Sequence, residues 1–440
     1  MKKIRVVVIG AGSMSLGRGT LADVMASDEL HDLDCTLCLV DIDEEALDVM
    51  FEVAGALKAH YGSPVKIERT TDRREGLAGA DYVIAALAQK RQELWEQDFR
   101  LPLSLGFRHI LGENGGPGAA FHTLRSLELT IPICRDMEEL CPDALFLNFT
   151  NPESRVCMGI NELTGIRSVG LCHGMFMGEG VIAGALGRDK NELLLTIGGI
   201  NHFHWFLEVK DAATGEDLYP ELKEKLDAME PPLPPLTRQL LDLHGLLPFP
   251  WDNHIGEYIS YAYEFEGLKW EYGNEGKKVY LVEPEGEPWS PPREELKGYL
   301  RSGAPFPERM TRQSGEIAIP IICDVELDKG TREKAVNVPN DDFAVANLPE
   351  DAIVEVPAIV DAGGIHPVEV GPLPEAIAAM CRSQISIQKL LVAAYRERSR
   401  DLLLQALLLD PIVDSVSRAR LLIDEMLVIE EDFLPDMTGG

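Results

Sequence analysis

Basic residues are scarce in this 440-residue chain compared with acidic ones. Lysine and arginine together number 41, against 73 aspartates and glutamates, which gives a formal net charge of −32 at pH 7. A surface with this charge repels the phosphates of nucleic acids and of anionic membranes, so neither is expected as a partner. An anionic small-molecule substrate would need a local basic pocket.

Cysteine and long apolar runs are also scarce. The eight cysteines show no pattern of a disulfide framework, which is ordinary for a protein kept in a reducing compartment. No apolar run approaches the roughly 20 residues that a membrane-spanning helix requires. The run Val6–Ile9 is too short for the core of a secretory signal. We therefore expect a cytoplasmic protein rather than a disulfide-stabilised or membrane-spanning one.

Hydrophobic residues make up 45% of the chain and are patterned as alternating strands and helices over the first 150 residues. Short runs that are apolar throughout are typical of parallel strands buried on both faces. The alternation predicts an α/β fold with a Rossmann-type, doubly wound parallel sheet. The predicted strands cover residues 4–9, 36–40, 65–70, 80–86 and 145–147.

The rest of the chain has a mixed pattern that predicts a second, α+β domain. A stretch rich in Val, Ile and Pro, residues 316–369, predicts a second and largely antiparallel sheet. We expect a nucleotide-binding domain over residues 1–195 and an α+β domain over residues 196–440. Other predicted elements are strands 193–199 and 204–209 and helices 251–266, 374–406 and 411–427.

A glycine-rich turn, Gly10-Ala-Gly12-Ser13, follows the first predicted strand and opens a helix. Such glycines permit a tight turn and let the backbone approach a pyrophosphate at the helix N-terminus. Asp41 ends the second predicted strand, where a carboxylate can bind ribose hydroxyls, and this favours NAD over its 2′-phosphorylated form. Asp43 is the alternative ribose ligand, although capping the next helix also explains it. We expect Gly10, Gly12, Ser13, Met14 and Asp41 to bind the cofactor.

Five further motifs contain residue types that carry chemistry. Each has a structural explanation when taken singly: a cysteine is often core, an aspartate often caps a helix, and Asn-Pro often forms a turn. A cysteine and a histidine 30 residues apart are also a weak metal signal by spacing alone. The motifs are Glu113-Asn114 in a glycine-rich loop, Asn148-Phe-Thr-Asn151-Pro, Cys172-His173-Gly174, Gly199-Ile-Asn201-His202 and Asp252-Asn-His254-Ile-Gly-Glu257-Tyr258.

Together and in this order, the motifs resemble glycoside hydrolase family 4 over nearly the whole chain. That family has a GAGS turn, an acid pair after the second strand, Asn-x-x-Asn-Pro, a Cys motif, Gly-x-Asn-His and Asp-x-His-x-x-Glu-Tyr. The Gly363-Gly-Ile-His-Pro367 segment is also similar. The resemblance implies a lactate/malate-dehydrogenase-like Rossmann domain with a second α+β domain, and cofactors NAD and a divalent ion, typically Mn²⁺.

The resemblance also implies roles for individual residues. Cys172 and His202 would bind the metal, although a thiolate and an imidazole are an unusual pair for Mn²⁺. Asn148 would lie near the nicotinamide ribose, while Asn151, Asn201 and Glu113 would contact substrate. Asp252 would be the catalytic base, with His254 and Glu257 as alternatives. His173 would be the general acid, with Glu113 as a second candidate.

The implied reaction is not the usual two-carboxylate hydrolysis. NAD⁺ takes hydride from sugar C3, and a base removes the C2 proton. The C1–O bond breaks by elimination, water adds at C1, and the hydride returns. The tripeptide His173-Gly174-Met175 is similar to the branch of the family associated with uronic acids. We therefore expect an α-galacturonidase or α-glucuronidase, with Arg91, Arg125 or Arg312 binding the substrate carboxylate.

Other functions fit parts of the same pattern. One is a neutral α-glucosidase or α-galactosidase of the same family. Another is a metal-independent, NAD-dependent 2-hydroxyacid dehydrogenase, and a third is a catalytically inactive NAD-binding regulator. The substrate would be a small glycoside or oligosaccharide in the first case. By analogy with this superfamily we expect a homodimer or homotetramer.

Overall fold

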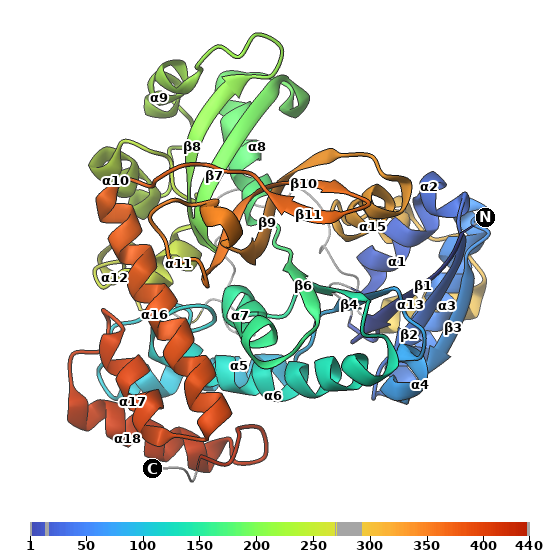
Figure 1. Cartoon of the computed structure of the whole chain (residues 1–440), viewed down its shortest axis with the longest axis horizontal. Coiled ribbons are helices and arrows are strands. Elements are labelled where there is room, and N and C mark those ends of the chain that lie inside the picture. Colours follow the sequence, from blue (N-terminus) through green and yellow to red (C-terminus); the bar gives the residue numbers. More distant parts are fainter. Residues whose placement is uncertain (1, 14–16, 269, 271–292, 438–440) are drawn as a thin grey trace.

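The fold is described from a computed structural model that places all residues except 1, 14–16, 269, 271–292 and 438–440 (Figure 1). Its centre is a nine-stranded sheet in the order β11-β10-β9-β6-β5-β4-β1-β2-β3. The strands of this sheet are β1 Lys3–Ile9, β2 Asp34–Val40, β3 Lys66–Thr70, β4 Tyr82–Ala85, β5 Leu145–Asn148, β6 Arg167–Gly170, β9 Thr331–Pro339, β10 Ile353–Asp361 and β11 Gly364–Pro367.

The six N-terminal strands are parallel and form the predicted Rossmann-type sheet. β1 lies between β2 and β4, with Ile9 in register with Val40 and Ala85. Strand order reverses beside β1, so the turn that follows β1 lies at the topological switch point, where such sheets bind ligands. The α/β prediction and the five predicted strands are confirmed.

The second antiparallel sheet predicted for residues 316–369 is wrong. Residues 318–327 form a helix, and β9, β10 and β11 are antiparallel to one another but extend the first sheet. β9 joins β6 through an antiparallel bridge between Gly170 and Asn337. The strand pattern of this segment was readable in the sequence, but its partner strand depends on tertiary packing.

A separate two-stranded hairpin carries one of the expected metal ligands. It consists of the two predicted strands, β7 Leu193–Ile200 and β8 Phe203–Asp211, which pair antiparallel. Asn201 and His202 form its turn. Gly199 has a φ of +150°, and a Cβ there would lie 2.4 Å from the Phe203 carbonyl oxygen, so this hairpin end requires glycine.

Helices cover both faces of the large sheet. α1 packs against α3 and α15, and α6 packs against α4 and α7, with these two groups on opposite faces (Figure 1). The helices are α1 Gly17–Ala26, α2 Asp28–His31, α3 Glu44–Tyr61, α4 Arg73–Leu77, α5 Arg91–Ser104, α6 Gly116–Leu140, α7 Glu153–Leu163, α8 Gly174–Leu186, α9 Tyr219–Asp227, α10 Pro235–His244, α11 Asp252–Ile255, α12 Tyr263–Glu266, α13 Arg293–Ser302, α14 Glu308–Thr311, α15 Ala318–Leu327, α16 Glu375–Glu397, α17 Arg400–Leu409 and α18 Val416–Ile429.

Two predicted helices are interrupted in the structure. The helix expected over 251–266 is divided into α11, a 3-10 turn and α12. The helix expected over 374–406 is divided into α16 and α17. Arg398 between them is left-handed with φ +54°. The hydroxyl of Ser399 caps α17 by accepting a hydrogen bond from Leu402 N at 3.3 Å. The predicted helix over 411–427 is α18, which begins at Val416.

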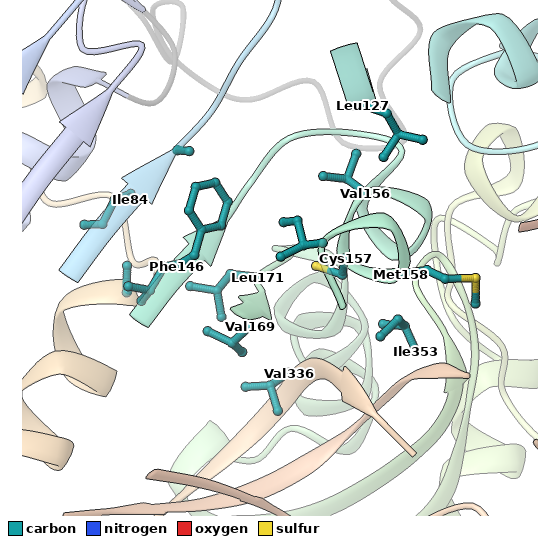
Figure 2. Packing of buried hydrophobic residues seen from close by; sticks show 14 of the residues in the cluster. Ile84, Leu127, Phe146, Val156, Cys157, Met158, Val169, Leu171, Val336 and Ile353 are labelled. Atoms are coloured by element: carbon teal, nitrogen blue, oxygen red, sulfur yellow. The ribbon is translucent and has the colours of Figure 1, made fainter. Parts of the chain in front are cut away.

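The main core lies between the sheet and helices α6 and α7. Figure 2 shows Ile84, Phe146 and Val169 from adjacent parallel strands, with Val336 from β9 and Val156 from α7 close to them. All five side chains are fully buried. The C-terminal strand β9 therefore shares one core with the parallel strands, which anchors the second half of the chain to the first.

A cavity of about 490 Å³ opens beside the first residues of β4, β5 and β6, lined by Tyr82, Leu145 and Arg167 among others. It lies at the edge of the sheet where the parallel strands begin, opposite their carboxyl ends. None of the predicted site residues lines it. Among the described residues, no helix is both long and apolar enough to cross a membrane.

Candidate active site

The glycine-rich turn follows β1 directly and is closely packed. Gly10 has a φ of +81°, and a Cβ there would lie 2.6 Å from the Ala86 carbonyl oxygen. A Cβ at Gly12 would lie 2.8 Å from a carboxylate oxygen of Asp41. The fold therefore excludes a side chain at both positions, as close backbone approach to a dinucleotide would also require.

The two acids after β2 have different surroundings. Asp41 accepts hydrogen bonds from the backbone N–H of Gly12 at 2.8 Å and of Asp43 at 2.9 Å, so it lies against the glycine turn. Asp43 accepts from Ala46 N at 3.0 Å and is the N-cap of α3. The placement of Asp41 suits a ribose ligand, whereas Asp43 is occupied as a helix cap.

The remainder of the turn leads into α1. The carbonyl oxygen of Ser13 accepts from Gly17 N at 3.0 Å, which starts the helix. Met14, also expected to contact the cofactor, lies outside the described residues.

The expected asparagines lie where β5 ends. Asn148 is fully buried, and its amide bonds the backbone of Thr150 in both directions at 3.1 Å. Asn151 follows, and its carbonyl oxygen accepts from the Ser126 hydroxyl at 2.6 Å. Both therefore lie at the carboxyl edge of the sheet, where ligands bind in this class of fold. Their proposed contacts with ribose and sugar stay predictions.

Cys172 and His202 meet although they come from different elements. Cys172 follows β6 by two residues, and its sulfur lies 3.1 Å from Nε2 of His202 in the β7–β8 turn. The His202 ring stacks on Phe249 with centroids 5.5 Å apart. His202 has a φ of +59°, a conformation that non-glycine residues rarely adopt and that occurs most often at functional sites.

The chemistry of this pair fits a divalent cation. Burial raises the pKa of the Cys172 thiol and lowers that of the His202 imidazole, so without a cation both are neutral at pH 7. A metal ion would favour the thiolate and use the neutral imidazole as a ligand. The Asn201 amide lies beside the thiol and lowers its pKa, and its buried oxygen has no hydrogen-bond partner among the described residues. The described residues contain no cluster of three His, Cys, Asp or Glu for a metal, so substrate or water would complete the shell.

His173 lies next to the pair and contacts an acid from the second half of the chain. Its Nδ1 is 3.0 Å from Oε1 of Glu316, and the His173 side chain is 44% exposed. Packing alone explains the glycine at position 174 of the His173-Gly174-Met175 tripeptide. A Cβ there would lie 3.1 Å from the Phe249 ring.

Glu113 lies close enough to the metal pair for its charge to act on His202. Burial lowers the pKa of both His202 and His254, and the charge of Glu113 partly opposes this shift. The Glu113 carboxylate is 3.2 Å from the Arg91 guanidinium. Glu257 holds this loop, because its Oε1 accepts from the backbone N–H of Glu113 at 2.5 Å and of Asn114 at 2.9 Å. Burial raises the pKa of Glu257 well above its ordinary value. The structure thus assigns Glu257 to positioning Glu113.

Asp252, the predicted base, has a structural function in this conformation. Its carboxylate accepts from Leu236 N at 2.6 Å, and from the backbone N–H and hydroxyl of Thr237 at 2.7 and 2.6 Å. These bonds hold the first turn of α10 and occupy both oxygens. The catalytic role of Asp252 stays a prediction, and this geometry does not favour it.

His254 lies beside the expected metal ligand His202. Its ring centroid is 4.8 Å from that of His202, and Nδ1 is 2.5 Å from the Asn253 amide oxygen. Burial, followed by the neighbouring His202, lowers the pKa of His254 to about 3. A pKa of about 3 makes this imidazole a weak base, so its place beside His202 does not rank it above Asp252, and both stay candidates.

Two findings were not accessible from local sequence. Arg125 cannot bind substrate, because it is buried against Asp98 at 3.0 Å and against Glu430. Glu316 was not among the predicted site residues. It lies 143 residues after His173 in the chain, and nothing in its neighbouring sequence indicates the contact.

Comparison with known proteins agrees with these motifs. A model described as family 4 glycosyl hydrolase matches residues 5–187, and one described as the family 4 glycosyl hydrolase C-terminal domain matches residues 197–413. The chain is 31% identical to an alpha-glucosidase of Erwinia rhapontici, with 98% of each protein covered. It is 26% identical to an alpha-galacturonidase of Bacillus subtilis (strain 168), with 97% of each covered.

The solved structures show the same fold. A 6-phospho-alpha-glucosidase from gut microorganisms, in complex with NAD and Mn²⁺, superposes with a TM-score of 0.82 at 23% identity, covering 99% of this chain and 100% of that one. With an ordered set of motifs, a shared fold and family models that together span most of its length, this chain belongs to family 4 of the glycosyl hydrolases.

Proposed function

We propose that this family 4 enzyme hydrolyses α-linked hexuronides, with NAD and a divalent metal such as Mn²⁺ as cofactors. The observation that carries the substrate assignment is Arg91. Its guanidinium contacts Glu113 at 3.2 Å while 54% of its side chain stays exposed, so part of this cation faces outward beside the metal pair. A guanidinium can bind a carboxylate through two parallel hydrogen bonds. Arg312 is also exposed, four residues before Glu316, and is a second cation near the site.

The residues present supply a place for each cofactor. Gly10, Gly12 and Asp41 would hold the dinucleotide, and Cys172 and His202 the metal. When bound, NAD⁺ accepts a hydride and the cation stabilises negative charge on sugar oxygens.

The side chains around Cys172 and His202 would transfer protons and orient the sugar. His173 would protonate the leaving oxygen, and His254 or Asp252 would accept the proton from C2. Asn151 and Asn201 would orient sugar hydroxyls. The motifs of the family support this division of roles, although the hydrogen bonds of Asp252 with α10 do not favour its role as base.

A neutral α-glucoside or α-galactoside is the second candidate. The higher identity to an alpha-glucosidase, 31% against 26% for the alpha-galacturonidase, favours it. The packing of Gly174 against Phe249 also gives that glycine a reason unrelated to substrate. The dehydrogenase alternative loses its support, because the chain belongs to a glycosidase family and Arg125 is sequestered.

Hydrolysis of p-nitrophenyl glycosides tests the proposal. We expect release from α-galacturonide or α-glucuronide, but little from neutral α-glycosides, in the presence of NAD⁺, Mn²⁺ and reductant. EDTA should abolish it. Release from neutral glycosides alone would contradict the uronide assignment and keep the mechanism.

A variant of Arg91 tests the carboxylate contact. Arg91→Gln should raise KM for the uronide about tenfold or more, since one charged pair typically contributes a few kcal/mol. Arg100→Gln is the matched control on the same helix, because Arg100 pairs only with Glu96 on the exposed surface among the described residues. Equal effects of the two variants would count against Arg91. A cytoplasmic location and a homodimer or homotetramer remain part of this proposal, to be tested by fractionation and by light scattering.

A further inference from the structure

The segment that carries Glu316 is attached firmly to the Rossmann helix α1. Arg18, only 2% exposed, donates from its guanidinium to the carbonyl oxygens of Met310 at 3.2 Å and Arg312 at 2.9 Å. Asp23 accepts from the backbone N–H of Ser314 at 2.8 Å and from its hydroxyl. Two buried side chains of one helix, Arg18 and Asp23, therefore fix residues 310–314 from the second half of the chain.

Close packing reinforces this attachment. A Cβ at Gly19, on the same helix, would lie 2.8 Å from the Ser314 Cβ, so the glycine allows the segment to lie directly on α1. Tyr61 from α3 adds a hydrogen bond from its hydroxyl to the Thr311 carbonyl oxygen at 2.6 Å. The segment is thus held by its backbone, independently of the contact that Glu316 makes.

Glu316 projects from this anchored segment to the candidate site. The backbone N–H of Glu316 donates to the Ser314 hydroxyl at 2.9 Å, and its side chain is 17% exposed. Its Oε1 lies 3.0 Å from Nδ1 of His173. Nδ1 is therefore the ring nitrogen turned toward Glu316, and Nε2 is the ring nitrogen left for the proton transfer proposed for His173.

The helix α8, which begins directly after His173, contacts the ring but forms no capping hydrogen bond with it. His173 is the N-cap residue of α8. Its ring is tilted against Phe176 with centroids 5.6 Å apart. The contact with Glu316 comes from outside this helix and meets the ring at Nδ1.

We propose that Glu316 is a positioning residue that holds the His173 ring in the orientation used for the substrate. The inference rests on the proposed function only in that His173 acts on substrate, and it does not depend on whether that substrate is a uronide. The anchored segment keeps the carboxylate in place, and the carboxylate in turn fixes the tautomer and orientation of the imidazole.

A double-mutant cycle on kcat/KM tests the proposal, with whichever p-nitrophenyl α-glycoside the enzyme hydrolyses. Glu316→Ala should lower kcat/KM about tenfold when His173 is present and less than about twofold in His173→Ala. The loss should fall on the same parameter, kcat or KM, that His173→Ala changes. The melting temperature and the affinity for NAD⁺ should match the parent protein. If Glu316→Ala does not fold, Glu316→Gln takes its place in the cycle.

A second carboxylate–imidazole pair provides the control. Asp361 and His366 are 3.0 Å apart on the exposed β10–β11 hairpin, and Asp361→Ala should leave kcat/KM unchanged. An equal loss from Glu316→Ala in both backgrounds, or no loss in the first, would overturn the inference. A parallel fall in melting temperature and NAD⁺ affinity would overturn it too, because it would show a purely structural role. Full activity of His173→Ala would overturn both the role of His173 and this inference. If the enzyme hydrolyses only neutral α-glycosides, the uronide assignment fails, but the roles of His173 and Glu316 are still tested on those substrates.

Discussion

The sulfur of Cys172 and Nε2 of His202 lie 3.1 Å apart at a point where the end of β6 meets the turn of the β7–β8 hairpin. The contact joins the parallel sheet to the first element of the second half of the chain. Both side chains are neutral in the absence of a cation because burial disfavours their charged forms.

Removing either member of this pair should remove the metal. Cys172→Ala and His202→Ala are each expected to lower activity by at least about 100-fold, since the loss of an outer contact alone already costs about 10–100-fold. Metal content measured by mass spectrometry after dialysis against Mn²⁺ should fall with activity. Cys134→Ala is the control, because Cys134 is a buried thiol in α6 that is not among the site residues. Full metal content in both ligand variants would refute the assignment.

Replacing Asp252 separates its two possible roles. Asp252→Ala should lower the free energy of unfolding by about 1–3 kcal/mol, because the first turn of α10 loses a buried acceptor. Chemical denaturation measures this loss. Exchange of the sugar C2 proton with D₂O reports on the base. Exchange that persists in Asp252→Asn would assign the proton transfer to another residue, such as His254, and a stable variant without exchange would restore Asp252 as the base.

The buried cluster of Arg125 with Asp98 and Glu430 should be essential for stability. Arg125→Met leaves two buried carboxylates without their cation, and we expect a loss of about 3–5 kcal/mol in the free energy of unfolding. Arg100→Met breaks the exposed pair with Glu96 and should cost less than about 0.5 kcal/mol. Similar urea midpoints for the two variants would contradict this difference.

Glu153 should make stability fall as pH rises. Burial raises the pKa of Glu153 to about 8, from an ordinary value of 4.5. The folded state then binds a proton that the unfolded state has released, so this contribution is fully present below pH 4.5 and is lost as pH rises through 8. The slope should reach about 1.4 kcal/mol per pH unit between those limits.

The test is the pH dependence of urea denaturation in Glu153→Gln, which mimics the protonated acid and should flatten this slope. Glu138→Gln is the control. Its hydrogen bonds with Arg135 and Gly165 lower the pKa of Glu138, so that group has already titrated below this range. An unchanged slope in Glu153→Gln would show that Glu153 is ionised in the folded protein.

Local sequence was sufficient for the parallel sheet and its glycine turn. Continuous apolar runs such as Val6–Ile9 need burial on both faces, and a strand followed by glycines and a helix has few alternative structures. The same reasoning indicated antiparallel strands somewhere in residues 316–369, the range that contains β9 to β11, but placed them in a separate sheet and missed the helix α15. Which edge they join depends on β6, more than 150 residues earlier along the chain, as the bridge between Gly170 and Asn337 shows.

The sequence by itself determined the class of fold, the order of the motifs and hence the family. These depend on residue types at short spacing, which the covalent chain sets directly. Only the tertiary structure decided that Glu316 contacts His173, that Asp252 holds α10, and that Arg125 is sequestered. Each of these contacts forms because packing brings distant side chains within hydrogen-bond distance. Burial then favours a charged group that is paired or hydrogen-bonded over one that has no partner.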